Sequence, residues 1–140
     1  MESPNQNPGG QTRIIGSQDD PPSAGPGPEI MSAATLARDD VYNLANEKLG
    51  RVHDIMLDVP RGRIAYVVLS RGGVLGMGDK LFAIPWSALT LDTERKCFLL
   101  DVDEERLKNA EGFDKDSWPR MADLAWATKL HEYYDQPPYW

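Results

Sequence analysis

Two adjacent runs of β-branched and apolar residues, joined by a short turn, place the strongest constraint on the fold of this chain. The first run covers residues 51–59 and the second covers residues 63–70. Between them stand Pro60, Arg61 and Gly62, where proline presets one backbone dihedral and glycine tolerates positive φ. Runs of this composition around such a turn predict an antiparallel β-hairpin.

The second run of this hairpin is apolar on both faces. One set of alternating positions holds Ile64, Tyr66 and Val68, and the other holds Ala65, Val67 and Leu69. A strand that is covered on both sides fits a closed barrel, or a barrel face that is used for association. We therefore expect an all-β fold built as a small antiparallel β-barrel.

Further short strands are predicted on both sides of the hairpin. Residues 80–84 form an apolar run that Pro85 stops, and residues 89–91 and 96–102 flank a polar turn. Residues 32–36 are expected to form a short first strand. This gives five or six strands, and we assign residues 31–108 to the barrel domain.

The N-terminal segment differs in composition from the rest of the chain. Residues 1–28 contain six prolines and five glycines, and the large apolar side chains that stand out are Ile14 and Ile15. Two isoleucines cannot offset the entropy lost on ordering such a segment. We therefore expect residues 1–30 to form a disordered tail.

The C-terminal segment carries helix signals. Asp103 is placed to cap a short helix, and Asp116 or Ser117 to cap a longer one in which Pro119 is tolerated in the first turn. Residues 109–140 are therefore predicted to be a helical extension of the barrel. One face of the longer helix is expected to hold Trp118, Met121, Ala122, Ala125, Trp126, Leu130 and Tyr133.

Charge and cysteine content exclude several classes of function. The net charge of -7 gives no overall attraction to phosphate backbones, so a nucleic-acid partner is not expected. The single cysteine, Cys97, lies in an apolar run and is predicted to be a buried core residue. No apolar run is long enough to span a bilayer, and a cytoplasmic location is expected.

Three motifs resemble ligand sites but fail on their details. Residues 72–80 have the glycine spacing of a phosphate-binding loop, but Asp79 stands where lysine is required. Residues 101–105 are acidic but lack the glycine and glutamate of a calcium loop. His53 is placed on a strand and His131 on the polar side of the helix, without zinc-ligand spacing. We therefore expect no catalytic residue, cofactor or metal.

The order of these features resembles the PRC-barrel domain family, which is named for the H subunit of the photosynthetic reaction centre. The resemblance covers residues 31–140 and is closest to short, stand-alone bacterial members. It is carried by the sequences DIMLD at 54–58, GRIAYVVLS at 62–70, GGVLGMGDKLFAIPW at 72–86 and FLLDVDEERLKNAEGF at 98–113.

This resemblance implies a barrel fold and no catalytic residues. The expected function is a non-enzymatic protein-interaction or assembly module with an unidentified protein partner, and a homodimer is expected because apolar surface remains after the chain has packed. Two alternatives stay open. One is a small-molecule binder or enzyme that uses a cleft between the glycine-rich loop and the C-terminal helix, and the other, by family analogy, is a protein associated with RNA and ribosome maturation. The candidate interface residues are Tyr66, Val68, Val74, Leu75, Met77, Trp118, Trp126 and Tyr133.

Overall fold

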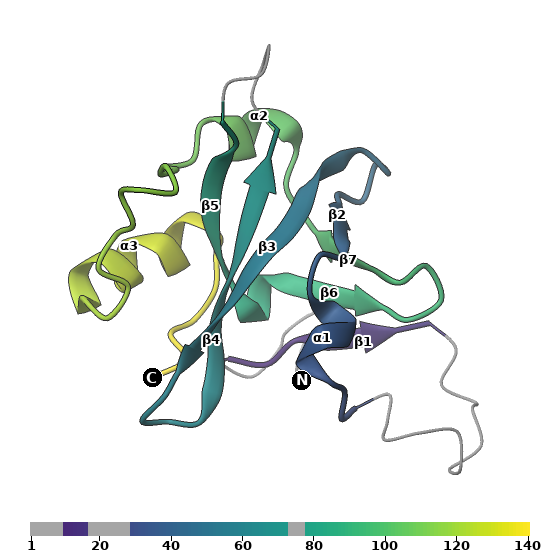
Figure 1. The fold of residues 1–140 in the computed structure, drawn as a ribbon, viewed down its shortest axis with the longest axis horizontal. Helices are drawn as coiled ribbons and strands as arrows, with labels where there is room; N and C mark the ends of the chain where they lie inside the picture. The colour runs from purple at the N-terminus through teal and green to yellow at the C-terminus, as the bar shows by residue number, and fades with distance from the viewer. Residues whose placement is uncertain (1–9, 17–28, 73–77) are drawn as a thin grey trace.

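The computed structural model describes residues 10–16, 29–72 and 78–140, and it is mostly β. Its strands form one sheet in the order β1-β6-β7-β2-β3-β4-β5, with β1 and β6 running across the direction of β3–β5 (Figure 1). The strands are β1 Arg13–Ile15, β2 Asp40–Tyr42, β3 Lys48–Asp58, β4 Arg63–Arg71, β5 Lys80–Pro85, β6 Leu89–Asp92 and β7 Cys97–Leu100. The helices are α1 Ala33–Leu36, the 3-10 turn η2 Trp86–Ala88, α2 Glu104–Lys108 and α3 Leu124–Tyr133.

The predicted hairpin is confirmed as β3 and β4. The strands pair in antiparallel register, with Asp58 opposite Arg63 and Met56 opposite Tyr66. Gly62 has a φ of 66° in the turn, a conformation that glycine adopts without a steric penalty. Two register shifts along β3 bend the hairpin, as bulges do. The second predicted hairpin is also confirmed, as β6 and β7.

The sheet is not closed, so the mostly β class is confirmed but the closed barrel is not. β1 and β5 are the two ends of the strand order, and no pairing joins them among the described residues. The chain after α2 covers the β5 edge, where Phe113 exchanges two backbone hydrogen bonds with Leu81 at 2.9 and 2.8 Å. Gly112 permits this approach, because a Cβ there would lie 2.9 Å from the Leu81 carbonyl oxygen.

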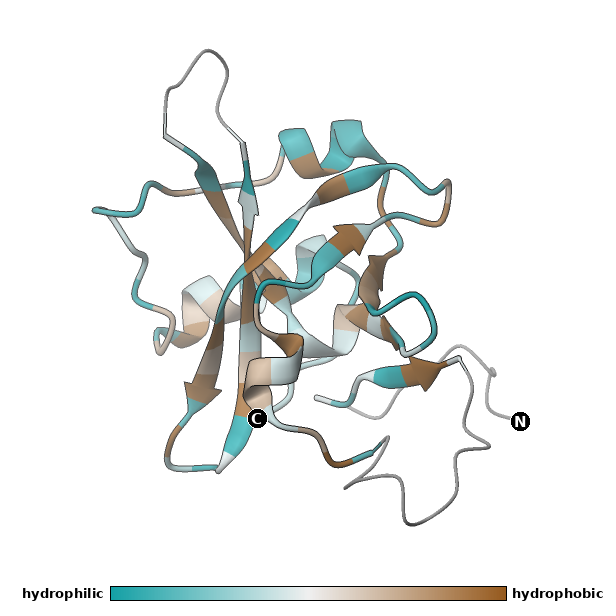
Figure 2. Ribbon diagram, turned by 45° about the vertical axis from the view of Figure 1, so that its right-hand side comes forward, coloured by the Kyte–Doolittle hydropathy of each residue, from teal (hydrophilic) through white to brown (hydrophobic). Residues whose placement is uncertain are grey.

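β4 is buried on both faces by the chain itself. Val67 and Leu69 belong to the main core, which draws on all the other strands. Tyr66 belongs to a second cluster with Ala127 of α3. α3 lies on the side of β4 and β5 away from β6 (Figure 1), and the hydrophobic stretches concentrate in the strands whereas α2 is mostly hydrophilic (Figure 2). The two-faced apolar pattern of β4 is thus satisfied within one chain.

Two secondary-structure predictions are corrected by local capping. Residues 32–36 do not form a strand, because the Ser32 side chain accepts a hydrogen bond from the Ala34 amide and starts α1. The longer helix begins at Leu124, not near residue 117, because Asp123 caps it by accepting from the Ala125 amide at 2.9 Å. Asp103 caps α2 as predicted.

Part of the segment predicted to be a disordered tail forms a strand. β1 pairs in parallel with β6, with Ile14 opposite Leu91, and Ile14 packs against the main core. The prediction of disorder is therefore wrong for β1, because a ready-made sheet edge supplies the hydrogen bonds that a short segment cannot make alone. Residues 1–9 and 17–28 of the predicted tail lie outside the described residues.

Two other predictions concern burial and membrane spanning. Cys97 is 2% exposed, so its predicted place in the core is confirmed. Among the helices that the structure describes, none is long and apolar enough to cross a bilayer.

We expect β1 to contribute measurably to stability. Ile14→Ala should lower the free energy of unfolding by about 1 kcal/mol, because it removes a partly buried side chain from the core. Ile15→Ala is the matched control, since Ile15 is exposed, and it should change stability by less than about 0.5 kcal/mol. Urea unfolding of the two variants measures both. Equal stability of the two variants would mean that β1 does not dock.

Candidate functional site

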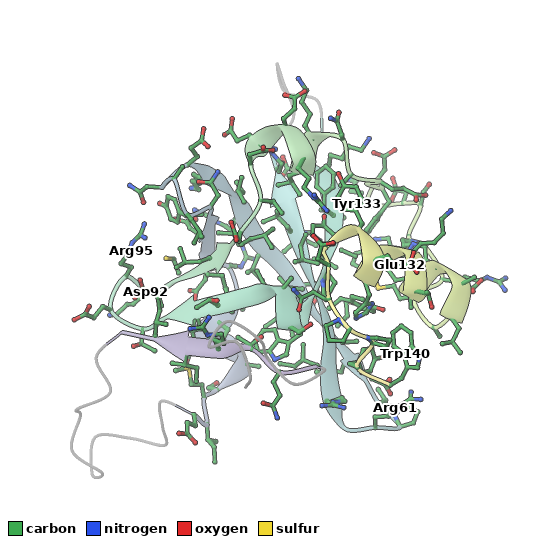
Figure 3. The ribbon with its side chains drawn as sticks, turned by 180° about the vertical axis from the view of Figure 1, so that it is seen from behind. Arg61, Asp92, Arg95, Glu132, Tyr133 and Trp140 are labelled. Atoms are coloured by element: carbon green, nitrogen blue, oxygen red, sulfur yellow. The ribbon has the colours of Figure 1, made fainter. Side chains whose placement is uncertain are left out.

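A cavity of about 460 Å³ lies between the β3–β4 hairpin and the C-terminal part of the chain. The hairpin wall includes Met56, Leu57, Asp58, Val59, Arg61 and Tyr66, and the opposite wall includes Met121, Leu124, Ala127, Tyr139 and Trp140. Figure 3 shows the labelled Arg61 and Trp140 at the same end of the molecule. Segments that are at least 55 residues apart in the sequence thus form one site.

The rim of the cavity is apolar and exposed. Leu57, Val59 and Leu124 line the cavity and are 64%, 80% and 58% exposed. They are three of the seven large apolar side chains that the described residues leave exposed, so exposed apolar surface gathers at this cavity. Contiguous exposed apolar surface of this kind marks interaction sites.

The polar groups of the cavity are already paired with one another. The Tyr139 hydroxyl donates to Asp58 Oδ2 at 2.6 Å, and the Arg61 guanidinium donates to the same oxygen at 3.0 Å. The hydrogen bond from Tyr139, with those from Arg61, lowers the pKa of Asp58 against some desolvation. Arg63 donates to the backbone carbonyl of Tyr139 at 3.0 Å and fixes the C-terminal segment on the hairpin.

Tyr66 is the exception to this pairing. Its side chain is 1% exposed, and its hydroxyl has no hydrogen-bond partner among the described residues. The ring packs against Trp126, His131 and Tyr139 at centroid distances of 5.4, 5.7 and 6.3 Å. Burial, and then the nearby Tyr139 and Asp58, raise the pKa of Tyr66, so the group is a neutral hydroxyl.

His131 of α3 packs in the same aromatic cluster. It is 3% exposed, and its Nδ1 lies 2.8 Å from the carbonyl oxygen of Ala127, so Nδ1 carries the proton. The ring of Trp140 packs on it at 5.0 Å. Burial lowers the pKa of His131 more than this hydrogen bond raises it. The prediction that His131 lies on the polar side of the helix is wrong, because the buried stripe of α3 holds Ala127 and His131, one position after the predicted Trp126 and Leu130.

The structure does not gather the predicted interface residues into one surface. Tyr66 and Val68 are buried at 1% and 0% exposure, so the chain leaves neither of them for a partner. Trp126 packs on Tyr66, and Tyr133 packs on Tyr134 and donates to the Arg106 carbonyl. Trp118 is 37% exposed and contacts Phe113. Val74, Leu75 and Met77 lie outside the described residues.

The predicted cleft between the glycine-rich loop and the C-terminal helix involves residues 73–77, which lie outside the described residues. The cavity that α3 lines is at the β3–β4 turn, where β4 starts, whereas the glycine-rich loop follows Arg71, where β4 ends. Sequence reasoning missed the rim residues Leu57 and Val59. The available signal was their spacing. Two apolar side chains two residues apart lie on the same face of a strand, and these two stand directly before the Pro60–Gly62 turn, at the end of the hairpin.

The described residues show no cluster of three or more His, Cys, Asp or Glu side chains that would hold a metal ion. The polar side chains that line the cavity include those of Asp58, Arg61, Tyr66 and Tyr139. Asp58 is engaged by two donors, and the described residues that line the cavity include no histidine.

The chain matches the PRC-barrel domain over residues 28–107, which is 80 of its 140 residues. The chain belongs to the PRC-barrel family. No curated protein matches it. The PRC-barrel match includes the hairpin wall of the cavity but ends before α3, so the opposite wall comes from the part of this protein that follows the family domain.

Removing the Tyr66 hydroxyl should stabilise this PRC-barrel protein. Tyr66→Phe keeps the ring contacts and removes a buried hydroxyl without a partner, so the free energy of unfolding should rise by about 1 kcal/mol. Tyr139→Phe is the matched control and should lower stability, because it breaks the hydrogen bond to Asp58. Thermal and urea unfolding test the opposite signs. A loss of stability in both variants would contradict an unpaired Tyr66.

Stability should fall as the pH drops below about 6.5, the pKa of an unfolded histidine. The folded pKa of His131 is lowered, so the unfolded chain binds the proton first and acid favours unfolding. The ionisable groups of the rings packed against it are Tyr66 and Tyr139, both neutral in this range. His131→Gln should flatten the fall in the free energy of unfolding between pH 7.5 and 5.

His53→Gln is the control for this experiment, because His53 is exposed on β3. The native protein and His53→Gln should show the same pH dependence. An identical pH dependence in His131→Gln would contradict a buried, neutral His131.

Proposed function

We propose that this PRC-barrel protein is a non-enzymatic interaction module, and that the rim of the cavity docks an apolar segment of another protein. The observation that carries the proposal is the exposure of Leu57, Val59 and Leu124 around one concave site. Their burial by a partner would release water from apolar surface, which is the main driving force of association. The cavity gives a partner side chain a place to insert, as anchor residues do at interfaces.

The charge of the surrounding segment supports a basic partner. Residues 111–140 carry six acidic against three basic side chains, and the whole chain has a net charge of -7. Asp58 is already paired with Arg61, so apolar contact supplies the affinity at the rim itself. Lysine or arginine residues that flank the apolar segment of the partner would then orient it and speed its association.

A homodimer remains a prediction. Tyr66 and Val68, the strand residues on which it rested, are buried inside the chain. Two acidic copies also repel each other, so we favour a different, basic protein as the partner. We propose a cytoplasmic setting, since the free thiol of Cys97 is compatible with a reducing compartment.

Photo-crosslinking from the rim tests the docking surface. A benzoylphenylalanine at Val59 in the full chain should give a discrete adduct with one basic protein in native cells. The same group at Leu44, which is 66% exposed in another part of the fold, is the matched control and should not give this adduct. Leu124→Asp, on the opposite side of the cavity, should abolish the Val59 adduct while circular dichroism shows an unchanged fold.

Three results would contradict the proposal. The first is the absence of an adduct at Val59, and the second is the same adduct from Val59 and Leu44. The third is an adduct of twice the mass of the chain, which would identify a second copy as the occupant. Sedimentation of the native protein at micromolar concentration would check that third result.

A further inference from the structure

A second cavity, of about 470 Å³, is lined by the start of β3 and the end of β4, where Arg51 lies opposite Ser70. The start of β3 and the β3–β4 turn are at opposite ends of the hairpin (Figure 1), so this cavity is separate from the docking site. The charged side chains in its lining are Arg38, Lys48, Arg51 and Asp79. Basic groups thus outnumber acidic ones here, in a chain whose net charge is -7.

Asp40 of β2 holds two of these basic side chains. Lys48 Nζ and Arg51 Nε lie 3.2 and 3.3 Å from the same oxygen, Asp40 Oδ1, and Asp40 itself does not line the cavity. One carboxylate does not neutralise two cations. Arg51 uses only Nε in this pair, so its two Nη groups have no acceptor among the described residues. Positively charged donors therefore remain for a ligand.

Arg38 is the third basic side chain, and it makes no hydrogen bond or ion pair with the part of the chain that the structure describes. Its φ of 67° lies in the left-handed region, which residues with a Cβ rarely adopt. Backbone hydrogen bonds fix this conformation, because the Asp39 amide donates to Leu36 at 3.3 Å and the Val52 amide donates to Asp39 at 2.8 Å. Strained residues of this kind cluster at ligand sites.

We propose that this cavity binds a small phosphorylated molecule, and that Arg38, Lys48 and Arg51 hold its phosphate group. A phosphate dianion has three terminal oxygens and two charges, so it accepts hydrogen bonds from several cationic side chains at once. The guanidinium group matches phosphate in geometry as well as in charge. The volume falls within the range of about 300–1,000 Å³ of small-molecule pockets, so it has room for the organic part of a phosphate ester.

The acidic groups near the cavity orient this ligand. The Asp79 carboxylate accepts a hydrogen bond from the Ser70 hydroxyl at 2.7 Å. Counting Asp40 and Asp79 against the three basic side chains leaves one net positive charge, so a phosphate group is drawn toward Lys48 and Arg51 and away from Asp79. The charge of the whole chain repels an extended nucleic-acid backbone, whereas a single phosphate group meets only this local charge.

This inference does not rest on the docking proposal. Docking uses Leu57, Val59 and Leu124, and none of these residues lines the second cavity. Leu124→Asp should therefore abolish docking and leave the binding of a phosphate ester in place, which separates the failure of one proposal from the failure of the other.

Four probes test the phosphate site by NMR titration of the full chain at constant ionic strength, at about pH 8, where phosphate is a dianion. Ribose 5-phosphate should bind at least about tenfold more tightly than ribose or acetate, which is the ratio that one charge-assisted hydrogen bond supplies. Inorganic phosphate should bind more weakly than ribose 5-phosphate, because it leaves the rest of the cavity unfilled. The amide signals of His53 and Ser70, which line the cavity, should shift on binding.

Three variants assign the binding to these side chains, with circular dichroism to check the fold. Arg38→Gln should weaken ribose 5-phosphate at least about fivefold, because it removes a charged donor. Arg120→Gln is the matched control, since it removes the same charge at an exposed residue that lines neither cavity, and it should keep the native affinity. Asp79→Asn keeps an acceptor for Ser70 and should tighten binding, because it removes a repelling charge.

Several outcomes would overturn the proposal. Absence of saturable binding of ribose 5-phosphate at millimolar concentration would do so, as would equal affinity for acetate, which would indicate unspecific attraction of anions. Equal affinity for inorganic phosphate would make the free ion the ligand. An equal loss in Arg38→Gln and Arg120→Gln, or weaker binding in Asp79→Asn, would place the phosphate group elsewhere on the protein.

Discussion

The burial of β4 on both faces is the constraint on which the rest of this structure depends. Val67 and Leu69 face the main core, and Tyr66 faces α3 and the C-terminal residues. An open sheet would leave this second face in water, so the chain must return across it after the last strand. The position of α3, the pairing of Arg63 with the C-terminal segment and the cavity at the β3–β4 turn all follow from that return.

The C-terminal segment does not cover the hairpin completely at the β3–β4 turn, and the cavity lies there. At this end of the hairpin, the side chains of Leu57 and Val59 line the cavity but stay exposed, because the C-terminal segment does not cover them. Nearby, the Tyr66 hydroxyl has no hydrogen-bond partner among the residues that the structure describes.

Sequence patterns predicted the parts of the fold that depend on local chemistry. The hairpin was predictable from Pro60 and Gly62, and the start of α2 from Asp103, since turn and cap preferences act within a few residues. The strand β1 was not predictable, because its stability comes from the distant edge of β6. The cavity was not predictable either, because it depends on how residues near 58 meet residues near 139, and no local pattern encodes that contact.

The boundary of the PRC-barrel match has a consequence for how such proteins diversify. The family domain supplies strands β2–β7 and one wall of the cavity, and the residues after Leu107 supply the other wall. The site is therefore shared between the family domain and the segment that follows it. An exposed lining position of that segment, such as Leu124, can vary and reshape the pocket, whereas Ala127 and Tyr139, which hold the segment on the hairpin, can change only at a cost in stability.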